Sequence, residues 1–237
     1  MKNKLNTIPE AIKAINNGEI IIVVDDENRE NEGDFVCASS KITSDKINFM
    51  AKEGRGLICC SLESERCEEL DLDLMVGKNT DIFGTSFTVS VDLKGNGVST
   101  GISASDRSKT IKALVDSKTK PSDFTKPGHI FPLRSIDGGV LRRAGHTEAS
   151  VDLPKLAGLF PSGVICEILN EDGSMARLND LFKVADKHGL LIISIKDLIK
   201  YKIGKESLIE EKETVDLPTK YGNFKLISFE QKDTKDI

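Results

Sequence analysis

The chain contains no tryptophan, only two tyrosines and only three histidines among its 237 residues. No apolar stretch approaches the ~18–20 residues that a membrane-spanning helix needs, so we expect no membrane partner. The first residues lack the apolar region and cleavage site of a signal peptide. Thr7 and Glu10 instead have the capping-box spacing that starts a helix.

Positive charge is not in excess either. The 33 Lys and Arg residues face 38 Asp and Glu residues, for a net charge of -5, and no basic stripe suggests a nucleic-acid partner. The five cysteines have no metal-ligand spacing, and most lie in apolar strand-like runs, where a thiol behaves as a small hydrophobic group. We therefore expect reduced thiols in a cytoplasmic protein.

The most informative segment is residues 25–34, which hold six carboxylates and one arginine. It follows the apolar run 20–24, a buried-strand pattern, so the carboxylates are expected at the carboxyl end of a strand, where α/β folds usually place chemistry. Like charges this close raise one another's pKa values unless a cation lies among them, and a hard divalent ion such as Mg²⁺ prefers oxygen ligands. A solvated acidic loop is the alternative that composition leaves open.

Helix and strand patterns alternate along the chain without a nucleotide-binding fingerprint. They predict an α+β or mixed α/β domain over about residues 1–204, a single mixed sheet with helices packed around it. The expected helices cover residues 8–16, 44–53, 105–116, 147–158 and 177–188. The expected strands cover residues 19–25, 35–38, 56–62, 86–92, 164–168 and 190–193. The turn at residues 94–97 predicts a hairpin that continues into residues 98–102, and a Pro- and Gly-rich loop is expected before residue 147.

The second informative segment is residues 142–148, Arg-Arg-Ala-Gly-His-Thr-Glu. Small residues let a ligand approach the backbone, Thr147 can cap the following helix, and backbone N–H groups beside an arginine suit a phosphate. His146 can bind a metal when it is neutral. A helix start with surface arginines is the simpler alternative.

Two of the histidines, His129 and His146, lie in glycine-containing segments, whereas His188 has the position of a helix C-terminal residue. Glu167 interrupts an apolar strand, so it is either partnered, suited to acid–base work, or directed outward. Together these features suit a phosphorylated sugar and a divalent metal. No P-loop and no nucleophile motif competes for the site.

Five motifs, in order and with matching spacing, resemble the 3,4-dihydroxy-2-butanone 4-phosphate synthase family. They are residues 29–34 (Arg-Glu-Asn-Glu-Gly-Asp), 101–107 (Gly-Ile-Ser-Ala-Ser-Asp-Arg), 121–124 (Pro-Ser-Asp-Phe), 127–134 (Pro-Gly-His-Ile-Phe-Pro-Leu-Arg) and 145–149 (Gly-His-Thr-Glu-Ala). The resemblance covers about residues 5–201. It implies a lyase that converts D-ribulose 5-phosphate to L-3,4-dihydroxy-2-butanone 4-phosphate and formate, with Mg²⁺ or Mn²⁺. It also implies a homodimeric α+β fold with active sites at or near the subunit interface.

The same resemblance assigns residues to roles. It implies that Glu30 and His146 are the metal ligands, and that His129 and Glu167 are needed for catalysis. Cys59, counted with the catalytic residues, and Thr100 correspond to positions that line the family's pocket. The implied substrate contacts are Arg29, Glu30, Asp34, Thr100, Arg143, Ala144, Gly145, His146, Thr147 and Glu167.

Residues 205–237 differ in character from the rest. A charged connector leads to residues 215–224, which resemble the first strand of a GTP cyclohydrolase II domain. The sequence lacks the zinc cysteines and nucleotide site of such a domain, so no cyclohydrolase activity is expected from it. Two alternatives to the synthase remain: a metal-dependent phosphosugar isomerase or aldolase, and a phosphosugar-binding regulatory module.

Overall fold

The structure is a computed structural model that describes residues 4–205 and 209–231. The chain divides into two compact units, one up to Ile199 and one from Lys200. The first unit contains a seven-stranded sheet with the order β4-β5-β3-β6-β2-β1-β7. Its strands are β1 (Ile21–Val24), β2 (Gly33–Ala38), β3 (Cys59–Leu62), β4 (Val91–Leu93), β5 (Phe124–Arg134), β6 (Ser162–Glu167) and β7 (Ile192–Ser194).

Two strand pairs, β1 with β7 and β3 with β5, are parallel, and the other neighbours are antiparallel. The helices are α1 (Ile8–Asn17), α2 (Ser44–Phe49), α3 (Ser64–Glu69), α4 (Ala104–Leu114), α5 (His146–Leu156), α6 (Leu178–His188) and α7 (Ile195–Ile203). Shorter turns are η1 (Ser39–Lys41), η2 (Met50–Gly54, a π-helix), η3 (Pro121–Asp123) and η4 (Gly139–Leu141). A mixed sheet with helices around it confirms the α+β fold class.

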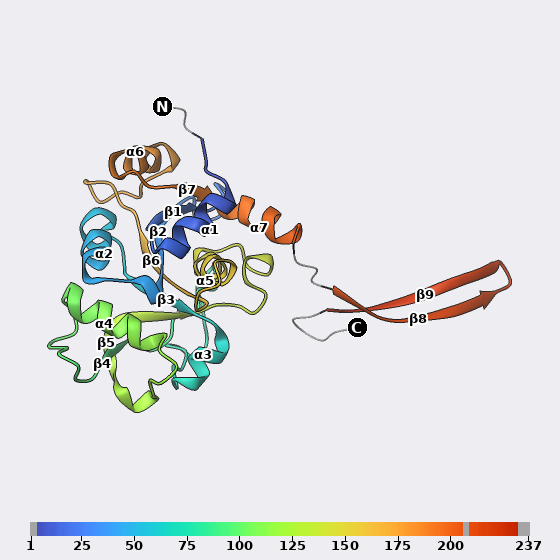
Figure 1. Ribbon diagram of the computed structural model, residues 1–237, viewed down its shortest axis with the longest axis horizontal. Helices are drawn as coiled ribbons and strands as arrows, with labels where there is room; N and C mark the ends of the chain where they lie inside the picture. Colours follow the sequence, from blue (N-terminus) through green and yellow to red (C-terminus); the bar gives the residue numbers. More distant parts are fainter. Residues whose placement is uncertain (1–3, 206–208, 232–237) are drawn as a thin grey trace. The chain divides into compact units, whose positions relative to one another are not determined.

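The sheet is buried on both faces, and strand alternation divides its side chains between them. Phe35, Cys60 and Cys166 belong to the core that includes Ile47 of α2 and Leu181 of α6. On the other face, α5 contacts β1, β2, β3 and β6, and α1 contacts α5. In Figure 1, α2 and α4 lie on one side of the sheet and α1 and α5 on the other.

Local sequence explains the first helix. The Thr7 hydroxyl accepts from the backbone N–H of Glu10, whose carboxylate accepts from the backbone N–H of Thr7, so the expected capping box is confirmed. Gly18 ends the helix in the left-handed region, with φ 82°. The five cysteines are free and buried.

The expected hairpin through residues 98–102 is wrong. β4 pairs with the distant β5 instead. The Asp106 carboxylate accepts the backbone N–H groups of Ser99 and Gly101, which draws this segment onto the start of α4 and away from strand pairing. The expected strand at residues 86–92 shrinks to Val91–Leu93, with isolated bridges at Phe87 and Thr88.

The Pro- and Gly-rich stretch before residue 147, predicted to be a loop, contains a strand. β5 runs for 11 residues and pairs with β3 and β4. Proline normally argues against a strand interior because it cannot donate a ladder hydrogen bond. The short helices α3 and α7 were also not expected.

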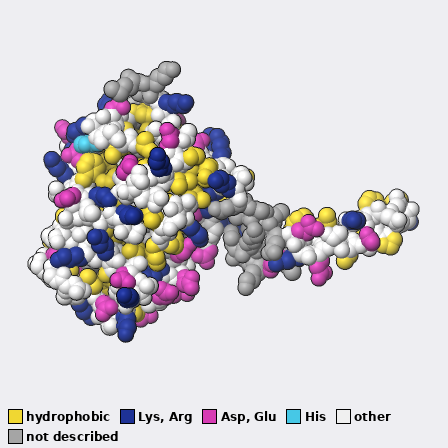
Figure 2. Space-filling view, in the orientation of Figure 1, with side chains coloured by type: hydrophobic (Ala, Val, Ile, Leu, Met, Phe, Trp, Pro, Cys, Tyr) yellow, Lys and Arg dark blue, Asp and Glu magenta, His cyan; other side chains and the backbone are white. Residues whose placement is uncertain are grey.

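Among the described residues, no helix combines the length and the apolar character that a membrane crossing requires. On the face of the molecule shown in Figure 2, basic and acidic side chains are interspersed rather than segregated.

The second unit contains an antiparallel hairpin of β8 (Ile209–Thr219) and β9 (Gly222–Gln231). Its apolar side chains remain exposed, with Tyr221 80% and Leu226 56% accessible, and several are visible in Figure 2. A two-stranded hairpin is at best marginally stable by itself. The described side chains of this hairpin form no core of their own.

Candidate active site

Strand register gathers four side chains on the face of the sheet that α5 covers. Asp34 of β2 pairs directly with Glu167 of β6, and Cys59 of β3 pairs with Ile165. Directly paired residues of neighbouring strands project on the same face. Glu167 and Ile165 are two residues apart on β6, so all four share one face.

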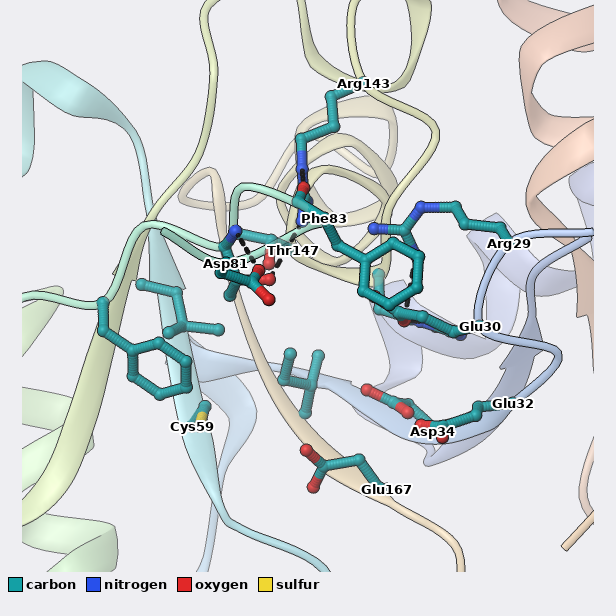
Figure 3. Close-up of a pocket in the computed structure, with 15 residues that line it drawn as sticks. Arg29, Glu30, Glu32, Asp34, Cys59, Asp81, Phe83, Arg143, Thr147 and Glu167 are labelled. Carbon is teal, nitrogen blue, oxygen red and sulfur yellow. Dashed lines mark hydrogen bonds and ion pairs between the residues drawn. The ribbon is translucent and has the colours of Figure 1, made fainter. Parts of the chain in front are cut away.

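These residues border a cavity of about 310 Å³. The cavity is lined by Arg29, Glu30, Glu32, Asp34, Cys59, Asp81, Phe83, Thr85, Phe87, Leu133, Arg143, His146, Thr147, Ile165 and Glu167. In Figure 3, Glu32, Asp34 and Glu167 lie on one side of this space, and Phe83 and Arg143 lie on the other. The volume suits a small polar metabolite.

The acidic loop is the connection between β1 and β2, and Asp25 organises it from within. The Asp25 carboxylate accepts the backbone N–H groups of Glu30 at 3.0 Å and Glu32 at 2.9 Å, and its Oδ2 lies 3.1 Å from an Arg29 nitrogen. The Asp25 side chain is fully buried. The loop is therefore folded around one carboxylate and directs Glu30 and Glu32 into the cavity.

Glu30 meets His146, the first residue of α5. The His146 Nε2 lies 3.1 Å from the carbonyl oxygen of Val23, which can only accept, so Nε2 must carry a proton. The other ring nitrogen, Nδ1, lies 3.4 Å from the Glu30 carboxylate. A carboxylate beside an unprotonated Nδ1 would place two acceptors together, so a proton or a metal ion must lie between them.

The donor set fits a divalent cation. Ligand atoms of Asp25, Glu30 and His146 all lie within 4.8 Å of one another. The Asp25 carboxylate already accepts three hydrogen bonds, from Arg29, Glu30 and Glu32, so it has fewer lone pairs left than the Glu30 carboxylate. Glu30 and His146 are therefore the favoured ligands. Carboxylate and neutral imidazole are normal ligands for such ions.

The charged groups around the cavity shift one another's pKa values. Burial lowers the pKa of the His146 imidazole, but the charges of Asp34 and Glu30 outweigh it and raise that pKa to about 9. Burial, helped by the charge of Glu167, raises the pKa of the Asp34 carboxyl to about 7. Burial likewise raises the pKa of Glu32. Burial also opposes ionisation of Glu30, but His146 and Arg29 hold its pKa below the usual value. The cavity therefore holds one carboxyl group, that of Asp34, that exchanges protons near neutral pH.

Glu167 is oriented by the backbone. One of its carboxylate oxygens accepts the N–H of Leu57 at 2.8 Å. A Cβ at Gly56 would lie 2.5 Å from that same oxygen, so only glycine fits there. Glu167 therefore points into the cavity with one oxygen held and the other available.

Cys59 lines the cavity as a neutral group. Burial, followed by the charge of Glu167, raises the pKa of its thiol well above the usual value. A protonated thiol is a poor nucleophile, so Cys59 is suited to shaping the cavity rather than attacking a substrate.

The segment at residues 142–148 forms the start of α5, but the cap is Gly145 and not Thr147 as expected. A Cβ at Gly145 would lie 2.3 Å from an Arg143 nitrogen, which explains the glycine. Thr147 lies in the first helical turn and lines the cavity. Its neighbours Ala144 and Gly145 belong to the turn and do not line the cavity. The N-terminal end of α5 nevertheless faces a cavity that an anion could enter.

The Arg143 guanidinium donates hydrogen bonds to three protein groups. It donates to the Phe83 carbonyl at 3.0 Å, to the Thr85 hydroxyl at 3.1 Å and to the Glu148 carboxylate at 2.6 Å. These contacts use three of its five N–H donors. Arg143 therefore also ties the segment at residues 81–87 to α5.

The segment at residues 81–87 has no site signal in the sequence. Asp81, Phe83, Thr85 and Phe87 line the cavity, and Arg29 lies over the Phe83 ring at 5.3 Å. No charge cluster or glycine motif marked it, and residues 86–92 had the alternation of a strand. Glu32, which lay in the acidic segment, was not singled out.

Besides Ala144 and Gly145, two more predicted residues lie outside the cavity. His129 is on β5, where its ring contacts Asp92 of β4, and its side chain is 43% exposed. Thr100 lies in the exposed turn before α4. Their roles stay predictions.

Comparison with known proteins gives a consistent result. The family model described as 3,4-dihydroxy-2-butanone 4-phosphate synthase matches residues 9–201. Riboflavin biosynthesis protein RibBA of Cytophaga hutchinsonii is 62% identical over 234 residues, which cover 99% of this chain and 58% of that protein. RibBA of Aquifex aeolicus is 57% identical, with 97% of this chain and 57% of that protein covered. The chain thus spans little more than half the length of these relatives.

Solved structures agree. RibBX of A. baumannii, described as a two-domain synthase, superposes with a TM-score of 0.90 at 45% identity, covering 98% of this chain and 68% of that one. A 3,4-dihydroxy-2-butanone 4-phosphate synthase in complex with two magnesium ions superposes with a TM-score of 0.81 at 40% identity, covering 85% of this chain and 98% of that one.

Proposed function

The chain belongs to the 3,4-dihydroxy-2-butanone 4-phosphate synthase family, and we propose that it converts D-ribulose 5-phosphate to L-3,4-dihydroxy-2-butanone 4-phosphate and formate in riboflavin biosynthesis. The observation that carries this proposal is one cavity that joins the Glu30–His146 pair, the carboxyl groups of Asp34 and Glu167, and the N-terminus of α5. These parts match the needs of a sugar phosphate whose carbons must gain and lose protons. A cytoplasmic location stays a prediction.

Glu30 and His146 would hold the metal, Mg²⁺ or Mn²⁺. When bound, such an ion polarises the carbonyl and hydroxyl oxygens of a sugar. The similar synthase structure is in complex with two magnesium ions, which supports a divalent metal as the cofactor.

The remaining groups would move protons. The four-carbon product and formate together contain every atom of the pentulose phosphate, so the reaction needs no external oxidant or reductant. It does need protons removed from and returned to carbon and oxygen. Glu167, with one oxygen held by Leu57, can accept a proton on the other, and Asp34 with its pKa near 7 can act in either direction.

The phosphate would lie at the start of α5. Thr147 in the first turn of α5 and Arg143 before it line the cavity, and the backbone N–H groups of a helix start suit an anion. Arg29 also lines the cavity, and its guanidinium contacts the carboxylates of Asp25 and Glu30.

Arg143→Ala should weaken ribulose 5-phosphate binding by ~2–5 kcal/mol, because a desolvated charge pair with the phosphate is lost. KM should rise while secondary structure by circular dichroism stays unchanged. The variant also frees the segment at residues 81–87. Thr85→Val, which keeps the Arg143 charge and removes its hydrogen bond to Thr85, is therefore the matched control. A normal KM for Arg143→Ala would place the phosphate elsewhere.

We also propose a homodimer that shares its active sites. Thr100 and His129 are exposed and lie off the cavity of their own chain. Exposed apolar side chains flank both places, with Leu57 41% and Ile82 87% accessible near the cavity and Ile102 53% accessible beside Thr100. A partner that covers them would bring its own Thr100 and His129 to the cavity.

Subunit mixing tests this arrangement. Glu30→Gln and His129→Asn should each be nearly inactive, because each damages every site. After denaturation and refolding together, the mixture should regain about a quarter of native activity, since half of the dimers are mixed and each mixed dimer has one intact site. No recovery despite mixed-dimer formation would show that each cavity is complete within one chain.

Formate release tests the function itself. The purified protein should release formate from ribulose 5-phosphate in the presence of Mg²⁺, and lose this activity with a chelator. An isomerase or aldolase would consume the substrate without formate, and a binding module would not turn it over. Either result would replace the synthase assignment.

We propose that residues 1–204 form the synthase domain and that residues 205–237 are a connector and a stub resembling the start of a GTP cyclohydrolase II domain. A protein ending at Lys205 should retain activity, because the hairpin supplies none of the cavity's residues. A loss of more than about tenfold in kcat/KM, or ~1.4 kcal/mol, would show that the hairpin completes the site or the dimer.

A further inference from the structure

The turn at residues 94–97, which leads out of β4, contains the dipeptide Asn96-Gly97. Gly95, Asn96 and Gly97 have φ angles of 69°, 51° and 70°, so three successive residues lie in the left-handed region. All three are exposed, and a Cβ at Gly95 would meet no atom within 4 Å. Asn96 is therefore open to solvent between two residues that have no side chain to restrict backbone rotation.

Hydrogen bonds stabilise this turn through its carbonyl groups. The Val98 N–H donates to the Gly95 carbonyl at 2.8 Å, and the Lys109 Nζ of α4 donates to the Gly97 carbonyl at 2.7 Å. Among the residues that the structure describes, neither the Gly97 N–H nor the Asn96 side-chain amide has a hydrogen-bond partner. The Gly97 nitrogen and the Asn96 amide are therefore both free to react, and they are neighbours in the chain.

We propose that Asn96 is a site of spontaneous deamidation. The Gly97 backbone nitrogen attacks the carbonyl carbon of the Asn96 side chain, a new C–N bond forms, and the side-chain amide leaves as ammonia with the proton of the Gly97 nitrogen. Water then opens the cyclic imide at either of its two carbonyl carbons. One opening gives aspartate, and the other gives isoaspartate, in which the main chain runs through the side-chain carbon. Glycine favours the attack because it has no Cβ to hinder the nitrogen.

The same dipeptide occurs at Asn17-Gly18, where the structure opposes the reaction. The Gly18 N–H donates to the Ile15 carbonyl at 2.9 Å at the end of α1, and the Asn17 amide nitrogen lies 3.1 Å from the Glu19 carboxylate. Gly18 is also buried. A buried, hydrogen-bonded N–H becomes available only when the structure opens locally. The two dipeptides are chemically identical, so a difference in their reactivity comes from the fold.

The modification adjoins a predicted site residue. Thr100 follows in the connection that leads to α4, and this connection is attached to α4 through Lys109 and through the Asp106 carboxylate. Both products add a carboxylate close to Lys109, and isoaspartate also lengthens the main chain by a methylene group. Deamidation at Asn96 therefore changes the charge and the length of the segment that carries Thr100.

Peptide mapping by mass spectrometry, after incubation of the folded protein in mildly alkaline buffer, tests the proposal. Trypsin cleaves after Lys94 and Arg107, which isolates residues 95–107 with Asn96 as their single asparagine. This peptide should gain the mass difference between an amide and a carboxyl group, and an isoaspartyl methyltransferase should label it. In the folded protein, Asn96 should react at least ~10-fold faster than Asn17, because the end of α1 must open before Asn17 can react.

Protein unfolded in urea gives the reference rates. Without the fold, the two dipeptides should react at rates within about threefold of each other. Asn96→Gln is the matched control, and its peptide 95–107 should stay unchanged because glutamine would have to form a larger ring. Equal rates at Asn96 and Asn17 in the folded protein would overturn the proposal. A folded-state rate at Asn96 that lies ~10-fold or more below its unfolded rate would overturn it as well. Neither measurement depends on formate release, so the result is independent of the proposed function.

Discussion

Glu30→Gln should bind Mg²⁺ too weakly to detect by calorimetry and should lose at least ~100-fold in formate release. Glutamine keeps the size of the side chain but removes the charge that a hard cation requires. Substitution of residues that merely support metal ligands typically costs ~10–100-fold, so loss of a ligand should cost more. Because Glu30 faces His146 Nδ1 at 3.4 Å, the variant also leaves that nitrogen without its charged partner.

Glu27→Gln is the control for this variant. Glu27 lies in the same acidic loop but is exposed and does not line the cavity. It removes the same charge, so it should leave both the metal affinity and the activity close to native. Metal-stripped native protein should be inactive until Mg²⁺ or Mn²⁺ is restored. Tight Mg²⁺ binding by Glu30→Gln would assign the metal to other carboxylates, with Asp25 and Asp34 as the first candidates.

Glu167→Gln should lower kcat by at least ~10², the low end of a general acid–base contribution. Glutamine retains an oxygen for the Leu57 N–H but cannot accept a proton at neutral pH. Binding of Mg²⁺ and ribulose 5-phosphate should stay near normal. His129→Asn should behave similarly, and the double variant should lose less than the product of the two losses if both serve one step.

The melting temperature shows whether a loss of activity in Glu167→Gln comes from a folding defect. Asp34 and Glu167 are directly paired across β2 and β6, and like charges in such pairs are destabilising. Glu167→Gln removes that repulsion, so its melting temperature should not fall. Glu171→Gln, on the exposed turn after β6, is the matched control and should keep native kcat. Formate release by Glu167→Gln near the native rate would make Glu167 part of the scaffold, whereas loss of substrate binding would make it a ligand contact.

Much of this fold follows from local patterns. The Thr7–Glu10 capping box, the apolar runs of β1, β3 and β6, and Gly18 and Gly189 at the ends of α1 and α6 act over a few residues, and the sequence displays them. β5 cannot be recognised from local sequence, because its partners β3 and β4 are distant along the chain. Its prolines and glycine are also typical of a loop. Residues 98–102 do not form a strand, because the Asp106 carboxylate accepts the backbone N–H groups of Ser99 and Gly101.

The sequence by itself determined the family, the acidic loop and most of the chemical groups, because motif residues and their spacing are local properties. Only the tertiary structure decided that Asp34, Cys59 and Glu167 share one face, because strand register is set by pairing between segments far apart in the chain. It also decided that Phe83 and Thr85 close the cavity through Arg143, and that Asp92 lies under His129. The Asp92–His129 contact has no signal in the sequence, because it joins β4 and β5 across 37 residues.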